Sequence, residues 1–341
     1  MLSCSPTRFI VTTLIERAAL PLDTLRTGMY RLAFGIRPLA AMITLRDRRV
    51  ALTATLHALV AFSLTVLTPT LLLAVGPVFL GVAHVIADLR FLVLRRGLGR
   101  GWLAVIALAC ATLILLRAAS EFGLPFSIGS RLELGVVTLW MGAALMAGGL
   151  ASRRIGRILV GAVAVIALGI WAQIDPFAVR VAFAHVHNLI ALLLWLFLFR
   201  GRLRAVLLPL ALICALAALL LSGESYFWTE RFGSLDLMGL HVLEAADGLA
   251  PGLPLREAAG LTLSFTFLQS VHYSTWLLVL PQEDVRGQGT ATWRMAVRSM
   301  TRELGRIGLW IALGTMVLVP IAACFDLHGA RNLYLSLAMF H

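Results

Sequence analysis

The segment Thr70–Val93, with the sequence TLLLAVGPVFLGVAHVIADLRFLV, decides the fold class of this chain. Its only charged residues are Asp88 and Arg90, which follow a long apolar run. A helix rises about 1.5 Å per residue, so about 20 mostly apolar residues are needed to cross a hydrocarbon layer about 30 Å thick. The segment therefore predicts a transmembrane helix.

The rest of the chain has the same character. Of its 341 residues, 60% are hydrophobic and only 13% are charged, whereas about a quarter of the residues in a soluble domain are charged. This composition excludes a water-soluble globule and predicts an all-α polytopic transmembrane helical bundle of about nine to ten spans. The full-length predicted spans are Val50–Leu67, Thr70–Val93, Gly101–Leu116, Leu132–Gly149, Ile158–Ala172, Phe177–Phe199, Ala205–Leu221, Ala258–Leu280 and Ile307–Phe325. A further apolar stretch begins near Arg331 and reaches His341 after only about half a membrane thickness.

The net charge of +12 comes from Arg residues alone, because the sequence contains no Lys. These Arg residues gather in the first 49 residues and in alternate loops, near residues 90–100, 153–157, 200–204 and 286–306. Such loops face the cytoplasm, so we expect a cytoplasmic amino terminus and the inner membrane of a bacterium. No stacking aromatic residues are interleaved with the Arg clusters, so we expect them to contact membrane lipids and expect no nucleic-acid partner.

Two segments stand apart from the spans. Residues 1–49 contain no apolar run long enough to cross, which predicts an amphipathic region on the inner leaflet, followed by a transmembrane domain over residues 50–341. The longest predicted outer-side loop, residues 222–257, combines aromatic residues with a Pro/Gly-rich turn. It fits an interfacial helix, a lid or a plain loop. Pairs of small residues such as Gly142 and Ala147 do not have the spacing of the glycophorin-type dimerisation motif, so the oligomeric state cannot be read from the sequence.

Most of the eight His residues lie in apolar segments, where polar groups are costly and usually functional or paired. Counting along the spans places His84 about 3 Å from the bilayer midplane. The same count brings the other His residues of the spans, and His341 at the end of the last stretch, close to this depth; they are His57, His185, His187 and His272. Asp88 is the carboxylate placed well inside a span. The sequence therefore predicts a layer of imidazoles near one depth.

Helical spacing indicates which of these groups share a face. His84 and Asp88 are four residues apart, the spacing at which a carboxylate accepts an imidazole N–H and orients the ring. His185 and His187 point about 160° apart, so we expect that one of them, or Asn188 in its place, faces the neighbouring helices. His272 belongs to one polar and aromatic stripe with three neighbours, namely Gln269, Tyr273 and Trp276.

Neutral imidazoles suit iron, copper or zinc, and three or four of them with an open position suit a non-haem iron that binds dioxygen. We therefore expect Fe(II) to be the cofactor, with a haem held by two imidazoles or another transition metal as the alternatives. The predicted metal ligands are His84, His185, His187, His272 and His341. Asp88 and Asn188 are predicted to support the ligands, Tyr273 and Gln269 to act in catalysis, and Trp276 to line the substrate cavity.

Two short motifs resemble those of the Brp/Blh family of membrane β-carotene dioxygenases. Gly81-Val82-Ala83-His84 with Asp88 resembles the family's early GxxHxxxD motif, and FTFLQSVHYSTW at Phe265–Trp276 is similar to its late aromatic helix, with His272 at a metal-binding position. The resemblance implies an iron-dependent oxygenase that cleaves a conjugated double bond in a long apolar polyene. The family carries a second His where this chain has Trp276, and the number of helices and the spacing between the motifs also differ.

Several functions fit these observations. The first is a membrane-embedded metalloenzyme, an oxygenase that takes a carotenoid-like or other lipophilic small molecule from the bilayer. The alternatives are a b-type haem or electron-transfer subunit, a transporter that uses Asp88 and the His layer, and a non-enzymatic accessory subunit whose imidazoles only join helices. The chain lacks a Walker loop, a GxSxG elbow, an HExxH motif and a Rossmann fingerprint, which excludes the activities that depend on them.

Overall fold

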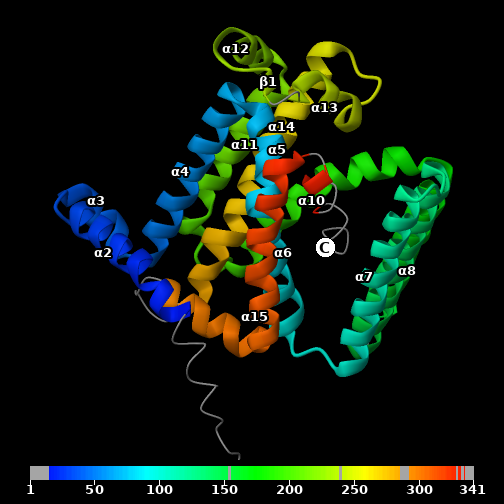
Figure 1. The fold of residues 1–341 in the computed structure, drawn as a ribbon, viewed down its shortest axis with the longest axis horizontal. Helices are drawn as coiled ribbons and strands as arrows, with labels where there is room; N and C mark the ends of the chain where they lie inside the picture. Colours follow the sequence, from blue (N-terminus) through cyan, green and yellow to red (C-terminus); the bar gives the residue numbers. More distant parts are fainter. Residues whose placement is uncertain are drawn as a thin grey trace, which may run out of the picture.

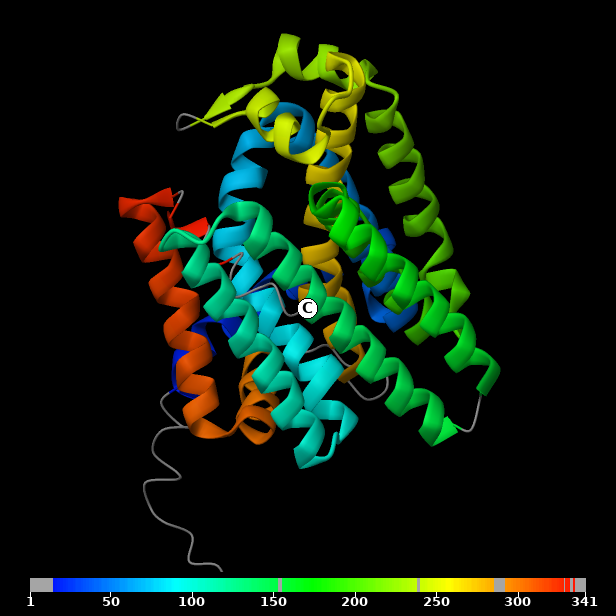
Figure 2. The ribbon, with the colours of Figure 1, turned by 90° about the vertical axis from the view of Figure 1, so that its right-hand side faces the viewer.

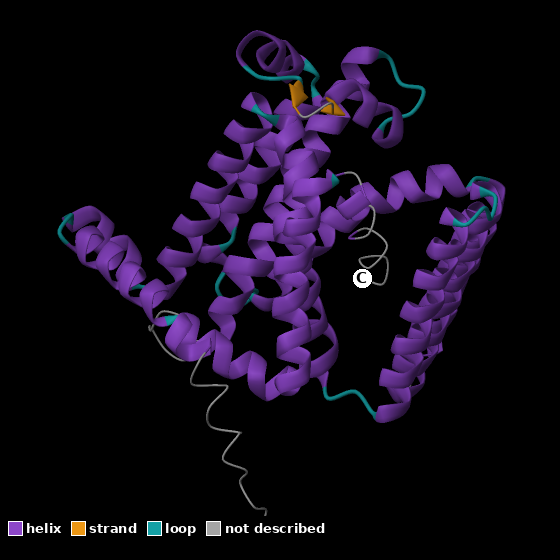
Figure 3. Ribbon diagram, viewed as in Figure 1, coloured by secondary structure: helices purple, strands orange, loops and turns teal. Residues whose placement is uncertain are grey.

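The computed structural model describes residues 15–152, 155–237, 240–284, 292–327, 329–331 and 334. This part of the chain is almost entirely helical, which confirms the predicted all-α polytopic bundle (Figures 1 and 3). The α-helices are α2 (Leu20–Phe34), α3 (Arg37–Thr44), α4 (Arg46–Leu67), α5 (Pro69–Gly76), α6 (Val82–Asp88), α7 (Arg100–Glu121), α8 (Phe126–Ser152), α9 (Ile155–Ile174), α10 (Pro176–Leu198), α11 (Leu207–Leu221), α12 (Glu224–Phe232), α13 (Val242–Leu249), α14 (Leu255–Ser274) and α15 (Trp293–Phe325). Shorter π- or 3-10-helical turns are η1 (Pro77–Gly81), η2 (Leu89–Val93), η3 (Leu94–Arg96), η4 (Leu203–Ala205), η5 (Thr275–Val279) and η6 (Leu280–Asp284).

The predicted loop over residues 222–257 is folded. It forms α12, α13 and a short antiparallel ladder between β1 (Asp236–Leu237) and β2 (Leu240–His241). Figure 1 shows these elements at one end of the bundle, opposite the start of α15.

Within the described residues, seven helices are long and apolar enough to cross a membrane. They are Arg46–Leu67, Pro69–Phe91, Gly101–Ser120, Ser127–Ala147, Pro176–Leu198, Leu203–Leu221 and Trp293–Phe325, and Ile158–Ile174 is a shorter apolar helix. The predicted span Ala258–Leu280 corresponds to α14 and η5, which are helical but lie outside these seven. Its buried polar residues, among them Thr262 and Ser264, lower its hydropathy.

Helix α14 is the centre of the bundle. It packs against α4, α10, α11, α12 and α13, and Figures 1 and 2 show it between these helices. Its Leu263 and Phe267 are fully buried in the main apolar core, together with Trp195 of α10 and Leu220 of α11. Because protein surrounds α14 on most sides, polar side chains on it avoid direct contact with lipid.

The helix from Pro69 to Val93 is interrupted by two π-helical turns, η1 and η2. Pro77 begins η1, and a proline has no backbone N–H with which to continue the regular hydrogen-bond ladder. A π-turn holds an extra residue and rotates everything that follows around the helix axis. The interruption therefore helps to set the direction in which His84 and Asp88 of α6 point.

The hairpin of α7 and α8 stands beside the central bundle (Figure 1). Helix α9 packs on α8, and both α8 and α9 contact α10. A buried ion cluster joins three of these helices. Glu133 of α8, 1% exposed, pairs with Arg117 of α7 at 3.0 Å and with Arg180 of α10. The cluster ties the hairpin to α10, because separating the helices would leave the charges of Glu133 and its arginines in an apolar setting.

The amino-terminal helices α2 and α3 lie at one edge of the bundle (Figure 1). Asp23 of α2 is buried and accepts hydrogen bonds from the backbone N–H of Trp293 at 2.8 Å and from Arg294 Nε at 3.0 Å. Burial alone would raise the pKa of Asp23, but these hydrogen bonds and the nearby Arg26 outweigh it, so the pKa lies below its ordinary value. Asp23 thus fixes α2 to the start of α15, while Leu25 and other apolar side chains of α2 remain exposed. Contact of this surface with the inner leaflet stays a prediction.

Candidate metal centre

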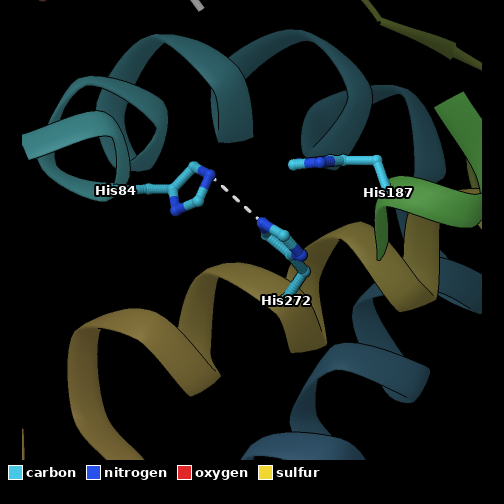
Figure 4. Close-up of side chains that lie close together, drawn as sticks. All are labelled: His84, His187 and His272. Carbon is cyan, nitrogen blue, oxygen red and sulfur yellow. Dashed lines mark hydrogen bonds between the residues drawn. The ribbon is translucent and has the colours of Figure 1, made fainter. Parts of the chain in front are cut away.

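Three imidazoles from three different helices meet in the interior of the bundle (Figure 4). They belong to His84 of α6, His187 of α10 and His272 of α14. Each offers one ring nitrogen, and these nitrogens all lie within 4.8 Å of one another. The closest pair, Nε2 of His84 and Nε2 of His272, is 3.1 Å apart. The three residues come from positions that the sequence predicted to lie near one depth.

The rings are arranged around a common point rather than stacked in a row. Ring centroids are 4.6 Å apart for His84 and His272 and 4.4 Å apart for His187 and His272, whereas His84 and His187 are 6.1 Å apart. His84 and His272 are buried, at 0% and 1% exposure, and His187 is half-buried. The chain thus concentrates nitrogen ligands at a site shielded from solvent, and the group could hold a metal ion.

Asp88 brings a carboxylate to this site. It is 3% exposed, and its Oδ2 lies 3.4 Å from Nε2 of His84. The predicted contact between the two side chains is therefore present. The carboxylate approaches the nitrogen that faces His272, however, and not the other nitrogen of the ring, as an orienting carboxylate behind a bound ring would. Asp88 thus places a carboxyl oxygen on the side of His84 from which a cation would bind.

The structure distinguishes between His185 and His187. His187 joins the cluster, while Nε2 of His185 lies 2.9 Å from the carbonyl oxygen of Leu249 and its ring packs against Phe265. The separation of the two side chains around α10 explains this difference. His185 is thus a predicted ligand that the described structure places outside the cluster.

Other predicted residues have different surroundings. His57 hydrogen-bonds at 2.9 Å to the carbonyl of Thr53 in its own helix. Asn188, which follows His187 in the sequence, is buried. Its Nδ2 atom has no hydrogen-bond partner within the described part of the chain. His341 lies outside the described residues.

The predicted aromatic stripe of α14 and η5 forms a wall of the site. The ring of Tyr273 lies 5.4 Å from that of His84, and the ring of Trp276 lies 5.8 Å from it. Both aromatic side chains are buried, and Gln269 Nε2 donates a hydrogen bond to the Tyr273 hydroxyl at 3.1 Å. The indole N–H of Trp276 has no acceptor among the described residues. The wall therefore combines apolar rings with polar groups.

Two further residues at the site were not predicted from the sequence. Tyr334 packs against the broken helix and hydrogen-bonds to Tyr273, and Arg331 lies close enough to Tyr273 to interact with it electrostatically. The only signal for them in the sequence was the short apolar stretch that begins near Arg331, which fixes neither its depth nor its neighbours.

No family model, curated protein or solved structure matches this chain. The function is therefore inferred from the geometry of the site.

Proposed function

We propose that this chain is a membrane-embedded metalloenzyme in which His84, His187 and His272 bind Fe(II), and that it oxygenates a lipophilic small molecule. The observation that carries the proposal is the convergence of three imidazole nitrogens within 4.8 Å inside a bundle of apolar helices. An isolated His in such a setting needs only one hydrogen-bond partner. Hydrogen bonding between packed helices does not require three imidazoles from three helices and a carboxyl group at one place.

The donor set favours iron among the candidate metals. Neutral imidazoles together with a carboxylate are the ligands of non-haem Fe(II) oxygenases, whereas structural zinc sites more often contain thiolates. No described Cys belongs to the cluster. The bound iron would supply the activation of dioxygen.

The protein residues supply binding and exclusion of water. Asp88 places a carboxyl oxygen beside the His84 nitrogen that faces His272, where it could become a further ligand of the bound cation. Tyr273 and Trp276 form the wall against which the substrate would lie. A lipophilic substrate reaches a site among apolar helices directly from the bilayer, where its concentration is highest.

The resemblance to the Brp/Blh family supports the oxygenase part of the proposal. The two motifs that carry it lie far apart in the sequence, yet they provide His84 and His272, whose Nε2 atoms are 3.1 Å apart. A carotenoid-like polyene is accordingly one candidate substrate. Trp276 occupies the position of the family's second late His, so in this chain the third imidazole would come from His187 of α10.

The test is the metal content and the ultraviolet-visible spectrum of the purified protein. We expect one iron per chain, without the Soret band of a haem, and loss of this iron in His272→Ala. The matched control is His185→Ala, which removes a nearby imidazole that hydrogen-bonds to the carbonyl oxygen of Leu249 outside the cluster and should leave the iron in place. Absence of iron, copper and zinc after reconstitution would refute the metal site. Alanine replacement of all three imidazoles that lowers stability alone would favour an accessory subunit.

A further inference from the structure

The chain returns to the metal centre after its last long helix. Tyr334 is 3% exposed and packs against Val78 and Val82 of the broken helix and Val319 of α15. Its ring lies directly over Gly81, where an added Cβ atom would stand 2.3 Å from Cζ of the tyrosine. Only a residue without a side chain permits this approach. The contact places the Tyr334 hydroxyl in the interior, one helical turn from His84.

Two phenol groups are joined beside the imidazoles. Tyr334 hydrogen-bonds to Tyr273, which also accepts a hydrogen bond from Gln269 at 3.1 Å. Tyr334 interacts electrostatically with Asp88, and the Tyr273 ring is 5.4 Å from the His84 ring. These hydroxyls therefore belong to the wall of the metal centre rather than to the surface of the bundle.

Arg331 adds a positive charge to the same wall. Its guanidinium interacts electrostatically with Tyr273, and its Nε atom is buried without an acceptor among the described residues. No carboxylate in the described part of the chain pairs with it. A partly buried cation without an anion is costly in an apolar setting, and ionisable residues inside membrane proteins mark substrate pathways and the counter-ions of ligands. A guanidinium presents its N–H groups in the planar arrangement that matches an oxyanion.

We propose that Arg331, with the hydroxyls of Tyr273 and Tyr334, binds the carboxylate at one end of a long-chain lipophile, which is the substrate of the metal centre. This assignment rests on the proposed function, and it narrows the substrate class from a pure hydrocarbon to a lipophilic acid. One guanidinium and two neutral hydroxyls match the single negative charge of a carboxylate better than the double charge of a phosphate monoester. The apolar chain of such a ligand would enter from the bilayer.

Calorimetric titration of the purified, metal-free protein in detergent tests the proposal. The probes are palmitate, the uncharged hexadecanol and hexadecyl phosphate, which share one chain length. We expect palmitate to bind at least about tenfold more tightly than hexadecanol, the effect of one charge-assisted contact. Arg331→Gln should abolish this preference and Arg331→Lys should retain part of it. Arg231→Gln, a matched change on the exposed helix α12, should have no effect.

Equal affinity of the wild-type protein for palmitate and hexadecanol would overturn the proposal, and so would an unchanged preference in Arg331→Gln or tighter binding of hexadecyl phosphate. The failure of the metal centre would look different. If the protein holds no metal but retains the Arg331-dependent preference for palmitate, the oxygenase fails and the carboxylate site stands. His272→Ala provides the same separation, because it should lose iron and keep the preference for palmitate.

Discussion

The substitution Gly81→Ala tests the close packing of Tyr334 on the broken helix. A Cβ atom at this position would lie 2.3 Å from Cζ and 2.4 Å from Cε2 of the tyrosine ring. Carbon atoms in contact are about 3.5–4.0 Å apart, so either the ring or the helix must move. The ring has little room to move, because it is buried and packs in one cluster with Val78, Val82 and Val319.

The neighbouring Gly76→Ala is a matched control for the effect of alanine itself. Gly76 ends α5, and its added Cβ would lie 3.8 Å from Cε2 of Tyr273, an ordinary contact distance. Both glycines have helical backbone angles, so alanine should favour the helix at each position by up to about 1 kcal/mol. Overpacking costs about 1–3 kcal/mol. We therefore expect Gly76→Ala to be neutral or stabilising, and Gly81→Ala to be about 1–3 kcal/mol less stable than Gly76→Ala.

Denaturant unfolding in mild detergent, followed by tryptophan fluorescence, would measure the difference in the free energy of unfolding. Palmitate binding should weaken in Gly81→Ala and not in Gly76→Ala, since displacement of Tyr334 disturbs its hydrogen bond to Tyr273. Adding Tyr334→Ala should remove the effect of Gly81→Ala, because the two residues are in direct contact. Equal stability of the two glycine variants would refute the placement of Tyr334.

Three other predictions concern charged groups. Asp88→Asn should weaken iron binding by about 10–100-fold, measured by competition with a chelator, since it removes the carboxylate next to His84. Asp23 has a pKa below its ordinary value, so its contribution to stability should be complete above the unfolded pKa of about 4 and should be lost as the pH falls through the lower folded pKa. Asp23→Asn should therefore destabilise the protein at pH 7. The difference in unfolding free energy between this variant and wild type should vanish near pH 2. Glu133→Gln should destabilise the protein by about 2–4 kcal/mol in the same unfolding assay, because two arginines lose their shared buried carboxylate; an effect below about 0.5 kcal/mol would mean that the cluster is solvated.

The convergence of His84 and His272 could be predicted because it depends on simple counting. Both residues lie near the middle of apolar segments of similar length, so a fixed rise per residue places them at similar depths. The direction in which each imidazole points was predictable only in part. The two-residue offset showed that His185 and His187 could not both contribute, but nothing in the sequence showed which of them faces α14.

The position of Asp88 at His84 shows the limit of such counting. A spacing of four residues predicted the contact, and the contact is present at 3.4 Å. The choice of ring nitrogen depends on the side-chain torsions and on the rotation of α6 after the π-turn at Pro77. Neither is encoded in a periodic pattern. Tyr334 was missed for a related reason, since its contact with Gly81 joins residues that are distant in the sequence.

The hydropathy of α14 carries functional information once its surroundings are known. This helix is less apolar than the lipid-facing spans, yet it lies at the centre of the bundle, where α4, α10 and α11 cover it. A polar side chain costs least where protein rather than lipid surrounds it. The central helix can therefore hold His272, Tyr273 and Gln269, while the outer helices present apolar side chains to the lipid. The same shielding keeps water from His84 and His272. Separate imidazoles at this position would lack hydration, so binding of both to one metal ion is favoured.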